Sequence, residues 1–159
     1  MAQTIYIETS IPSAYVSTRT DLGSKFRREE TRLWWHSQRD QFDVLISENV
    51  LIELYRGNWP GKSEAIQLVE HLPRLPTTDT VEATTREYIK ERLVPADIVG
   101  DAAHLAYSSV HGIDFLLTWN IRHLANPNKT KHLAIINQRL GFSTPLIITP
   151  EALWMENRT

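Results

Sequence analysis

Polar side chains that carry oxygen follow each of four short apolar runs in the sequence. The runs comprise residues 5–7, 44–46, 115–117 and 146–148. The segments directly after them are Glu8-Thr9-Ser10, Ser47-Glu48, Thr118-Trp119-Asn120 and Thr149-Pro150-Glu151. Glu53 follows soon after the second run, while Asp97 and Asp101 precede the third at a spacing that places them on one face of a helix. These side chains are the candidates for chemistry.

The residue types of these polar side chains indicate a metal site. Carboxylates brought together repel one another, and each has a raised pKa unless a cation compensates. Mg²⁺ and Mn²⁺ prefer oxygen ligands and keep several waters, and such an ion can activate water and stabilise charge on a phosphoryl oxygen. Cysteine is absent, which excludes disulfides, a thiolate zinc site and a cysteine nucleophile. The pattern favours a metal-dependent phosphodiesterase.

The elements that must position these residues follow from the apolar pattern. Short unbroken runs are typical of strands covered on both faces of a parallel sheet, and Arg74-Leu75 is a weaker fifth candidate between two prolines. Helical patterns occupy residues 24–41, 48–56, 63–72, 80–93, 96–110 and 129–140, with Ser47 expected to cap the second of them. The alternation predicts an α/β fold, a three-layer α/β/α sandwich with a central parallel sheet of four to five strands.

Open parallel sheets bind ligands beyond the carboxyl ends of their strands, so the polar segments are expected to meet at one edge. The 159 residues suit one domain, and no linker interrupts them. With 17 Lys plus Arg against 19 Asp plus Glu, the net charge of −2 excludes a protein that holds nucleic acid by bulk electrostatics. This net charge does not exclude a nuclease with basic residues around its active site.

The sequence also predicts the cellular location of the protein. No apolar run approaches the roughly 18 residues of a membrane span. The first ten residues lack the basic segment and long apolar run of a secretion signal. We therefore expect a cytoplasmic protein with no membrane partner.

The local strings and their order resemble those of PIN domains, and within them the VapC-like toxin ribonucleases of toxin–antitoxin pairs. The segments that carry the resemblance are IYIETS, ISENVLIEL, DAAHLAYSSVHGIDFLLTWNIRHLAN and IITPEAL. They span nearly the whole chain, so residues 1–159 are interpreted as a single PIN-like nuclease domain. The resemblance implies an α/β domain in which four acidic or polar positions surround Mg²⁺ or Mn²⁺ and cleave RNA, leaving 5′-phosphate and 3′-hydroxyl ends.

The family's metal-ligating and catalytic positions fall, in chain order, on Glu8, Glu53, Asp101 and Asn120. Glu8 is one methylene longer than the family's usual aspartate, which moves its carboxylate by roughly 1.5 Å. Asn120 offers a neutral oxygen, and as an alternative or additional role it is a candidate N-cap for residues 121–124. Glu8, Glu53 and Asp101 still provide three carboxylates, so the hypothesis of an active enzyme is favoured.

Other residues are expected around this set. Candidates for a supporting role near the metal are Thr9, Asp97 and Thr118, with a helix cap as the rival interpretation of Asp97. Candidates for RNA contact are Arg56, Arg122 and His123. His104, three residues after Asp101, is interpreted as a packed or surface histidine. The Trp34-Trp35 pair fits either core packing or an interface with a second copy or an antitoxin.

The favoured hypothesis is therefore an Mg²⁺- or Mn²⁺-dependent endoribonuclease with RNA as substrate. By resemblance it is the toxin of a toxin–antitoxin pair, with an antitoxin protein and a second copy as partners. The alternative is a catalytically weak or inactive PIN-like module that binds RNA or a partner protein. A phosphoenzyme phosphatase is disfavoured, because it needs an aspartate nucleophile after the first strand, where this chain has Glu8.

Overall fold

A parallel sheet lies at the centre of the computed structural model, which describes residues 2–156. Its strands are β1 (Thr4–Ile7), β2 (Asp43–Leu45), β3 (Phe115–Leu117) and β4 (Leu146–Ile148), in the order β2-β1-β3-β4. All three strand pairs are parallel. With seven α-helices in the described part of the chain, the protein is an α/β protein.

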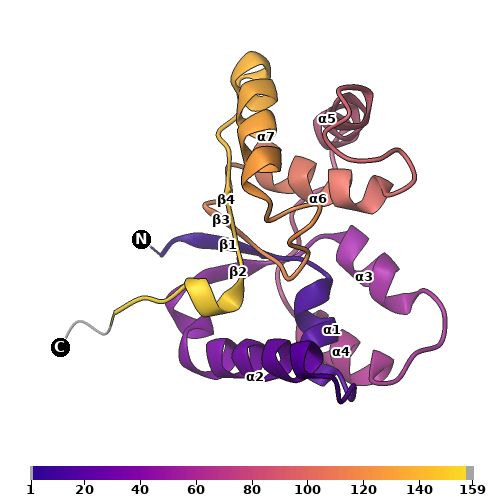
Figure 1. The fold of residues 1–159 in the computed structure, drawn as a ribbon. Helices are drawn as coiled ribbons and strands as arrows, with labels where there is room; N and C mark the ends of the chain where they lie inside the picture. The colour runs from indigo at the N-terminus through magenta and orange to yellow at the C-terminus, as the bar shows by residue number, and fades with distance from the viewer. Residues whose placement is uncertain (1, 157–159) are drawn as a thin grey trace.

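Helices lie on both sides of this sheet (Figure 1). On one side are α1 (Ser10–Val16), α2 (Leu22–Ser37) and α4 (Lys62–Val69). On the other are α5 (Asp79–Lys90), α6 (Val99–Val110) and α7 (Pro127–Leu140). The remaining helix, α3 (Glu48–Tyr55), contacts α4 and α6. Two 3₁₀ turns, η1 (Arg39–Gln41) and η2 (Pro150–Ala152), complete the elements.

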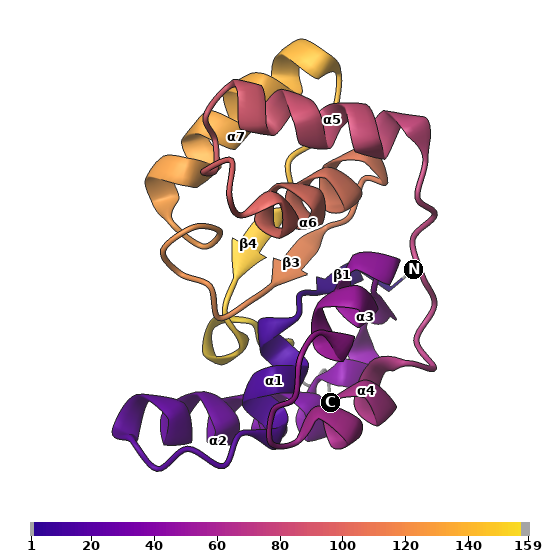
Figure 2. The ribbon, with the colours of Figure 1, turned by 90° about the vertical axis from the view of Figure 1, so that its right-hand side faces the viewer.

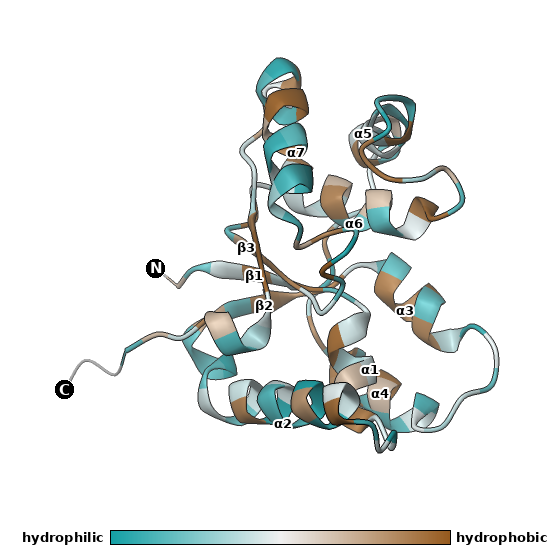
Figure 3. Cartoon of the chain, in the orientation of Figure 1, coloured by the Kyte–Doolittle hydropathy of each residue, from teal (hydrophilic) through white to brown (hydrophobic). Residues whose placement is uncertain are grey.

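The helices on both sides of the sheet enclose the hydrophobic core. Ile5, Tyr6 and Ile7 of β1 are fully buried, because β1 is paired on both edges and covered on both faces. Figure 2 shows β1, β3 and β4 between α6 and α1. Hydrophobic residues predominate on the strands in Figure 3, whereas the surrounding helices mix hydrophobic and hydrophilic residues. Within residues 2–156, no helix is long and apolar enough to cross a membrane.

The four predicted strands are confirmed, and the fifth is reduced to one bridge between Ile46 and Arg74. Ile46 donates its backbone N–H to Pro73 O and accepts from Leu75 N, at 3.0 and 2.8 Å. Pairing ends there because Pro73 and Pro76 have no N–H to donate to a longer ladder. The sheet therefore has four strands.

Some predicted helix ends shift, and one helix was missed. Asp21 caps α2 by accepting from Ser24 N at 3.0 Å, so α2 begins before residue 24, and it ends at Ser37. The other helices whose starts shift are α4, α5 and α7, which begin one or two residues earlier than predicted, and α6, which begins at Val99 instead of residue 96. Helix α1 was not predicted, because its seven residues include Pro12 and show no long helical period.

The Trp34-Trp35 pair belongs to the core. Trp34 is fully buried and donates its indole N–H to Leu153 O at 3.0 Å. Trp35 is 7% exposed and packs edge-on against Trp34. The core alternative is therefore confirmed for this pair, and the proposed interface role for it is wrong.

Candidate active site

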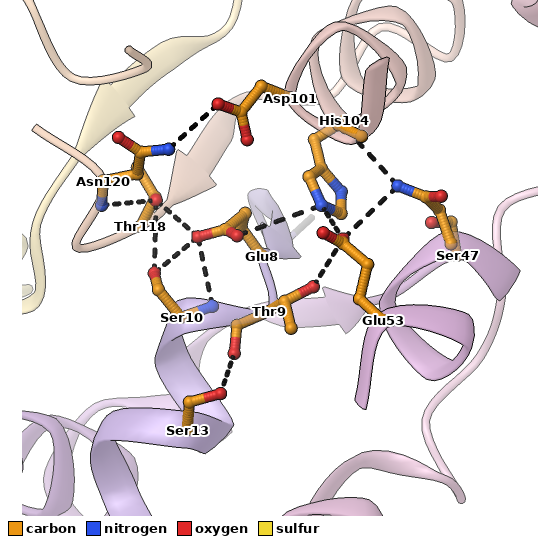
Figure 4. Close-up of polar contacts among 12 residues, drawn as sticks. Glu8, Thr9, Ser10, Ser13, Ser47, Glu53, Asp101, His104, Thr118 and Asn120 are labelled. Carbon is orange, nitrogen blue, oxygen red and sulfur yellow. Dashed lines mark hydrogen bonds and ion pairs between the residues drawn. The ribbon is translucent and has the colours of Figure 1, made fainter. Parts of the chain in front are cut away.

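Polar side chains converge where β1 and β3 end (Figure 4). The chain leaves β1 toward β2 on one side and returns to β3 on the other, so the switch in strand order falls between β1 and β3. Ligand sites of open parallel sheets lie at this position, outside the carboxyl ends of the strands. Glu8 follows β1 directly, and Thr118 and Asn120 follow β3.

Glu8 is 5% exposed and is held through one carboxylate oxygen. Its Oε1 accepts from Ser10 Oγ at 2.5 Å, Thr118 Oγ1 at 2.6 Å and Ser10 N at 3.2 Å. Ser10 is the first residue of α1, so the helix that the sequence did not predict supplies two of these donors. These contacts fix where the carboxylate of Glu8 lies.

Glu53 reaches the same region from α3 and is also held through one oxygen. Its Oε1 accepts from His104 Nε2 at 2.5 Å, Thr9 Oγ1 at 2.8 Å and Asn49 Nδ2 at 3.4 Å. The other oxygen, Oε2, faces Gly100 at the start of α6, where an added Cβ would lie only 3.1 Å away. The absence of a side chain at Gly100 therefore leaves room beside this oxygen.

Asp101, in the first turn of α6, pairs with Asn120. Asn120 donates Nδ2 to Asp101 Oδ2 at 3.2 Å and accepts through Oδ1 from His123 N at 3.1 Å. Asn120 makes the capping hydrogen bond predicted for it, although residues 121–124 form a turn and not a helix. In this arrangement its amide oxygen is used by the turn, and its amide nitrogen orients Asp101.

The three acids share one pattern of contacts. Each carboxylate accepts hydrogen bonds through one oxygen, and within residues 2–156 none reaches Glu8 Oε2, Glu53 Oε2 or Asp101 Oδ1. A carboxylate oriented through one oxygen by its neighbours, with the second oxygen available, is the usual form of a metal-binding carboxylate.

His104 connects two of these acids and is a site residue that the sequence interpretation did not favour. It is fully buried, and its Nε2 lies 2.5 Å from Glu53 Oε1 and 3.9 Å from Glu8 Oε2. Its Nδ1 is bonded to Tyr6 Oη at 2.6 Å. The available signal was its spacing of one helical turn from Asp101, which puts both side chains on one face of α6.

The electrostatics reflect this crowding of charge. Burial raises the pKa of Asp101, and the negative charge of Glu8 raises it further. Burial also acts to raise the pKa of Glu53, but the hydrogen bond and charge of His104 outweigh it and hold the pKa below its usual value. Burial lowers the pKa of His104, whereas Glu53 and Glu8 outweigh that effect and raise it. Three carboxyl groups, one buried and two partly buried, therefore lie close to a single histidine.

A cavity of about 350 Å³ opens beside Glu53 and Asp101. Arg56 and Asp97 also line it, so both lie at the site as predicted, and Arg56 is an exposed cation that helps to lower the pKa of Glu53. The cap role considered for Asp97 is wrong, because α6 begins at Val99 and its N-cap is Ile98. Asp97 instead lies in the preceding loop.

Thr9 and Thr118 are where their predicted supporting role needs them, bonded to Glu53 and Glu8. His123 is brought to the site through its backbone N–H, and the neighbouring Arg122 is exposed. Ser47 occupies the predicted N-cap position of α3, but its side chain makes no cap hydrogen bond. Its hydroxyl lies 2.6 Å from Tyr6 Oη instead.

The donor types present suit Mg²⁺ or Mn²⁺, since the available oxygens belong to carboxylates. As the side chains lie, however, no three His, Asp or Glu residues of the described chain form a group that could hold a metal ion. Mg²⁺ is commonly bound by one or two carboxylates, several waters and substrate phosphates, without a complete protein cage. The site fits that mode of binding.

Comparisons with known proteins leave the family open. No protein-family model matches the chain, and no curated protein matches it significantly.

Proposed function

We propose that this protein is a divalent-metal-dependent endoribonuclease of the PIN-like type. The observation that carries the proposal is the arrangement of three acids at the switch point of the sheet. Glu8, Glu53 and Asp101 come from three separate segments, and each is oriented through one oxygen while the other is left without a hydrogen bond from the described chain. Carboxylate oxygens crowded in this way, with Glu8 buried and the other two acids partly buried, favour binding of a hard cation.

In the proposed mechanism Glu8, Glu53 and Asp101 hold the ion through their available oxygens. When bound, Mg²⁺ or Mn²⁺ supplies Lewis-acid polarisation of the phosphodiester and lowers the pKa of water, which is the nucleophile. Asn120 orients Asp101, and Thr118 and Ser10 orient Glu8. The arrangement needs no covalent intermediate on a protein side chain.

The cavity beside Glu53 and Asp101 supports a phosphodiester substrate. Arg56 is exposed at its rim, and some cationic group near the site is needed for a polyanion to approach three carboxylates. Arg122 is exposed next to the turn that Asn120 caps, and so is available for the RNA contact predicted from the sequence. Single-stranded RNA is the substrate class that we propose.

The resemblance to PIN domains supplies the biological setting of this proposal. The four-stranded parallel sheet with helices on both sides supports the three-layer PIN-like assignment. From the same resemblance we propose a cytoplasmic toxin with an antitoxin partner and a second copy in a homodimer. These partners stay predictions that rest on the residues quoted for the resemblance.

A second candidate is a module that binds RNA or a partner protein without cleavage. The observation that favours it is the orientation of Asn120, whose amide oxygen is used by the backbone of His123. The carboxylates also do not form a group that could hold a metal ion as they lie in residues 2–156. The two candidates differ in one measurable property, metal-dependent cleavage.

The test is cleavage of an end-labelled single-stranded RNA with Mg²⁺ or Mn²⁺, followed by analysis of the product ends. We expect endonucleolytic products with 5′-phosphate and 3′-hydroxyl ends, and no cleavage in EDTA. Asp101→Asn should lower the rate by at least about 100-fold, because it removes a charged ligand at the reacting centre.

The matched control is Asp114→Asn. Asp114 precedes β3 at the opposite end of the strand, where its carboxylate accepts from Thr4 N and Thr4 Oγ1. This variant should cleave at the wild-type rate. RNA binding by the wild type without cleavage in either metal would contradict the nuclease proposal and favour the binding module.

A further inference from the structure

A chain of buried hydrogen bonds runs from the sheet to Glu53. Ser47 Oγ lies 2.6 Å from Tyr6 Oη, Tyr6 Oη lies 2.6 Å from His104 Nδ1, and His104 Nε2 lies 2.5 Å from Glu53 Oε1. Ser47, Tyr6 and His104 are each fully buried, whereas Glu53 borders the cavity. The chain therefore connects the core to the edge of the proposed active site.

The hydrogen-bond roles in this chain have a consistent direction. Glu53 as a carboxylate can only accept, so His104 Nε2 must carry the proton that they share. Tyr6 Oη, which bonds Nδ1, can donate or accept, and Ser47 Oγ, which bonds Tyr6 Oη, can take the complementary role, so Nδ1 is satisfied with or without a proton on it. Nε2 can therefore donate to Glu53 while Nδ1 stays bonded to Tyr6, and the Tyr6 bond holds the ring in the orientation that this donation needs.

Two features indicate that this chain of hydrogen bonds does more than fill space in the core. Buried polar groups are costly unless fully paired, and an apolar side chain at residue 6 would continue the hydrophobic strand without that cost. Ser47 occupies the N-cap position of α3 but makes no side-chain cap bond, even though serine is a favoured cap. Its hydroxyl is committed to Tyr6 instead of to its own helix.

The hydrogen-bond chain affects the orientation of the Glu53 carboxylate. With Oε1 fixed by His104 and Thr9, the carboxylate can present only Oε2, which lies beside Gly100. If the imidazole turned, Oε1 would lose its shortest hydrogen bond, and only Thr9 and Asn49 would still hold the carboxylate. Groups that orient a ligand in this way typically change metal affinity or activity when they are removed.

We propose that Tyr6 and Ser47 are positioning residues for Glu53 that act through His104. This inference rests on the proposed function, in which Glu53 is a metal ligand. Neither hydroxyl touches the reacting atoms. Their role is to hold the imidazole in the orientation that donates Nε2–H to the carboxylate.

The main experiment combines Tyr6→Phe with a matched control, Tyr107→Phe. Tyr107 stacks on Tyr6 with ring centroids 6.4 Å apart, but its hydroxyl bonds Thr77 at 2.6 Å and does not contact the site. Each variant removes one buried phenol hydroxyl from neighbouring rings. A purely structural role therefore predicts similar behaviour of the two proteins, whereas the proposed role predicts different behaviour.

The first readout is independent of activity. In the metal-free wild type, ring ¹H–¹⁵N NMR should show a slowly exchanging proton on His104 Nε2, assigned by its absence in His104→Gln. Tyr6→Phe should make that proton exchange at least about tenfold faster, since the ring loses its far-side partner, while Tyr107→Phe leaves it unchanged. Equal exchange in both phenylalanine variants would overturn the proposal.

The second readout is functional. Tyr6→Phe should lower both Mn²⁺ affinity, measured by calorimetry, and kcat for RNA cleavage by about tenfold, with KM for RNA unchanged. In the His104→Gln background the same change should have no further effect, because Tyr6 acts through His104. Additive effects in the double variant would contradict the proposed route.

Ser47→Ala provides a second entry to the same chain if Tyr6→Phe fails to fold. It should speed exchange of the Nε2 proton and reduce Mn²⁺ affinity in the same direction, by less than Tyr6→Phe. No change in either quantity would overturn the proposal. A wild type that shows the protected proton but neither binds Mn²⁺ nor cleaves RNA would instead refute the proposed function and leave the hydrogen-bond chain intact.

Discussion

Two buried polar clusters in this protein differ in charge and in how completely they are paired. One is the acidic cluster at the switch point of the sheet, built on Glu8, Glu53 and Asp101. The other lies between α5, α6 and α7, where Asn137 accepts from Tyr88 Oη and donates to Ser109 Oγ at 2.9 Å and Thr144 Oγ1 at 3.2 Å. Both are assembled from distant parts of the chain.

The neutral cluster uses its hydrogen-bonding groups internally. Asn137 is fully buried with both ends of its amide bonded, and burial raises the pKa of Tyr88 to about 12, so the phenol stays neutral. The acidic cluster keeps an oxygen on each acid without a hydrogen bond from the described chain. Burial of polar groups is therefore no sign of a site by itself, whereas surplus charge and available acceptors are.

The sharpest test of this contrast is a pair of substitutions, Glu8→Gln and Asn137→Ala. Glu8→Gln keeps the length and an acceptor for Ser10 but removes a charged ligand, so RNA cleavage should fall at least about 100-fold with little change in stability. Asn137→Ala leaves buried partners unpaired and should lower the free energy of unfolding by about 2 kcal/mol. Its cleavage rate per folded molecule should match the wild type.

Urea denaturation and RNA cleavage assays measure both properties on the same samples. The proposed difference between the two clusters is contradicted if Asn137→Ala impairs cleavage by folded protein as strongly as Glu8→Gln does. It also fails if Glu8→Gln destabilises the fold as much as Asn137→Ala. Either result would mean that the two clusters share one role.

The second prediction concerns pH. The pKa of His104 in the folded protein lies above its ordinary 6.5, so its stabilising effect is fully present below pH 6.5 and is lost as pH rises through the folded pKa. The free energy of unfolding in EDTA should fall on this alkaline side by at most about 1.4 kcal/mol per pH unit. The neutral cluster contributes no such slope.

Urea titrations at pH values from about 6 to 9 measure this slope. His104→Gln should flatten the curve over the same range, while Asn137→Ala should shift the curve down without changing its shape. A slope in His104→Gln equal to that of the wild type would assign the pH dependence to another group.

The smallest expected effect is at the rim of the acidic cluster. Arg56→Gln removes an exposed cation beside the cavity and should raise KM for RNA by about threefold, with a weaker dependence on salt and an unchanged kcat. Lys90→Gln, on α5 away from this cavity, is the control and should leave KM unchanged. A fall in kcat for Arg56→Gln would place Arg56 in the reaction itself.

Much of the fold was predictable because its signals are local. Residues 5–7 and 115–117 are unbroken apolar runs, and burial on both faces requires such runs in any parallel strand. The fifth strand failed because Pro73 and Pro76 prevent a ladder, and α1 was missed because packing against α2 and α4, not its own pattern, makes it helical.

The site was predictable in its acids and less so in their partners. Glu8 and Asp101 stand out because polar residues at the carboxyl ends of strands, or one helical turn apart, can be recognised in a sequence. Ser10 and Tyr6 carry no such signal, and the spacing of His104 from Asp101 fits a packed histidine equally well. Each has an ordinary structural use, and only their contacts with Glu53 or Glu8 distinguish them.

The sequence by itself determined the alternation of strands and helices, the lack of thiolate chemistry and the set of acids available at one edge of the sheet. Only the tertiary structure decided which oxygen of each acid is bonded and that Tyr6 supports His104. The physical reason is range. Strand and helix patterns are set by neighbours in the chain, whereas hydrogen bonds between residues 41 to 110 positions apart depend on how the elements pack.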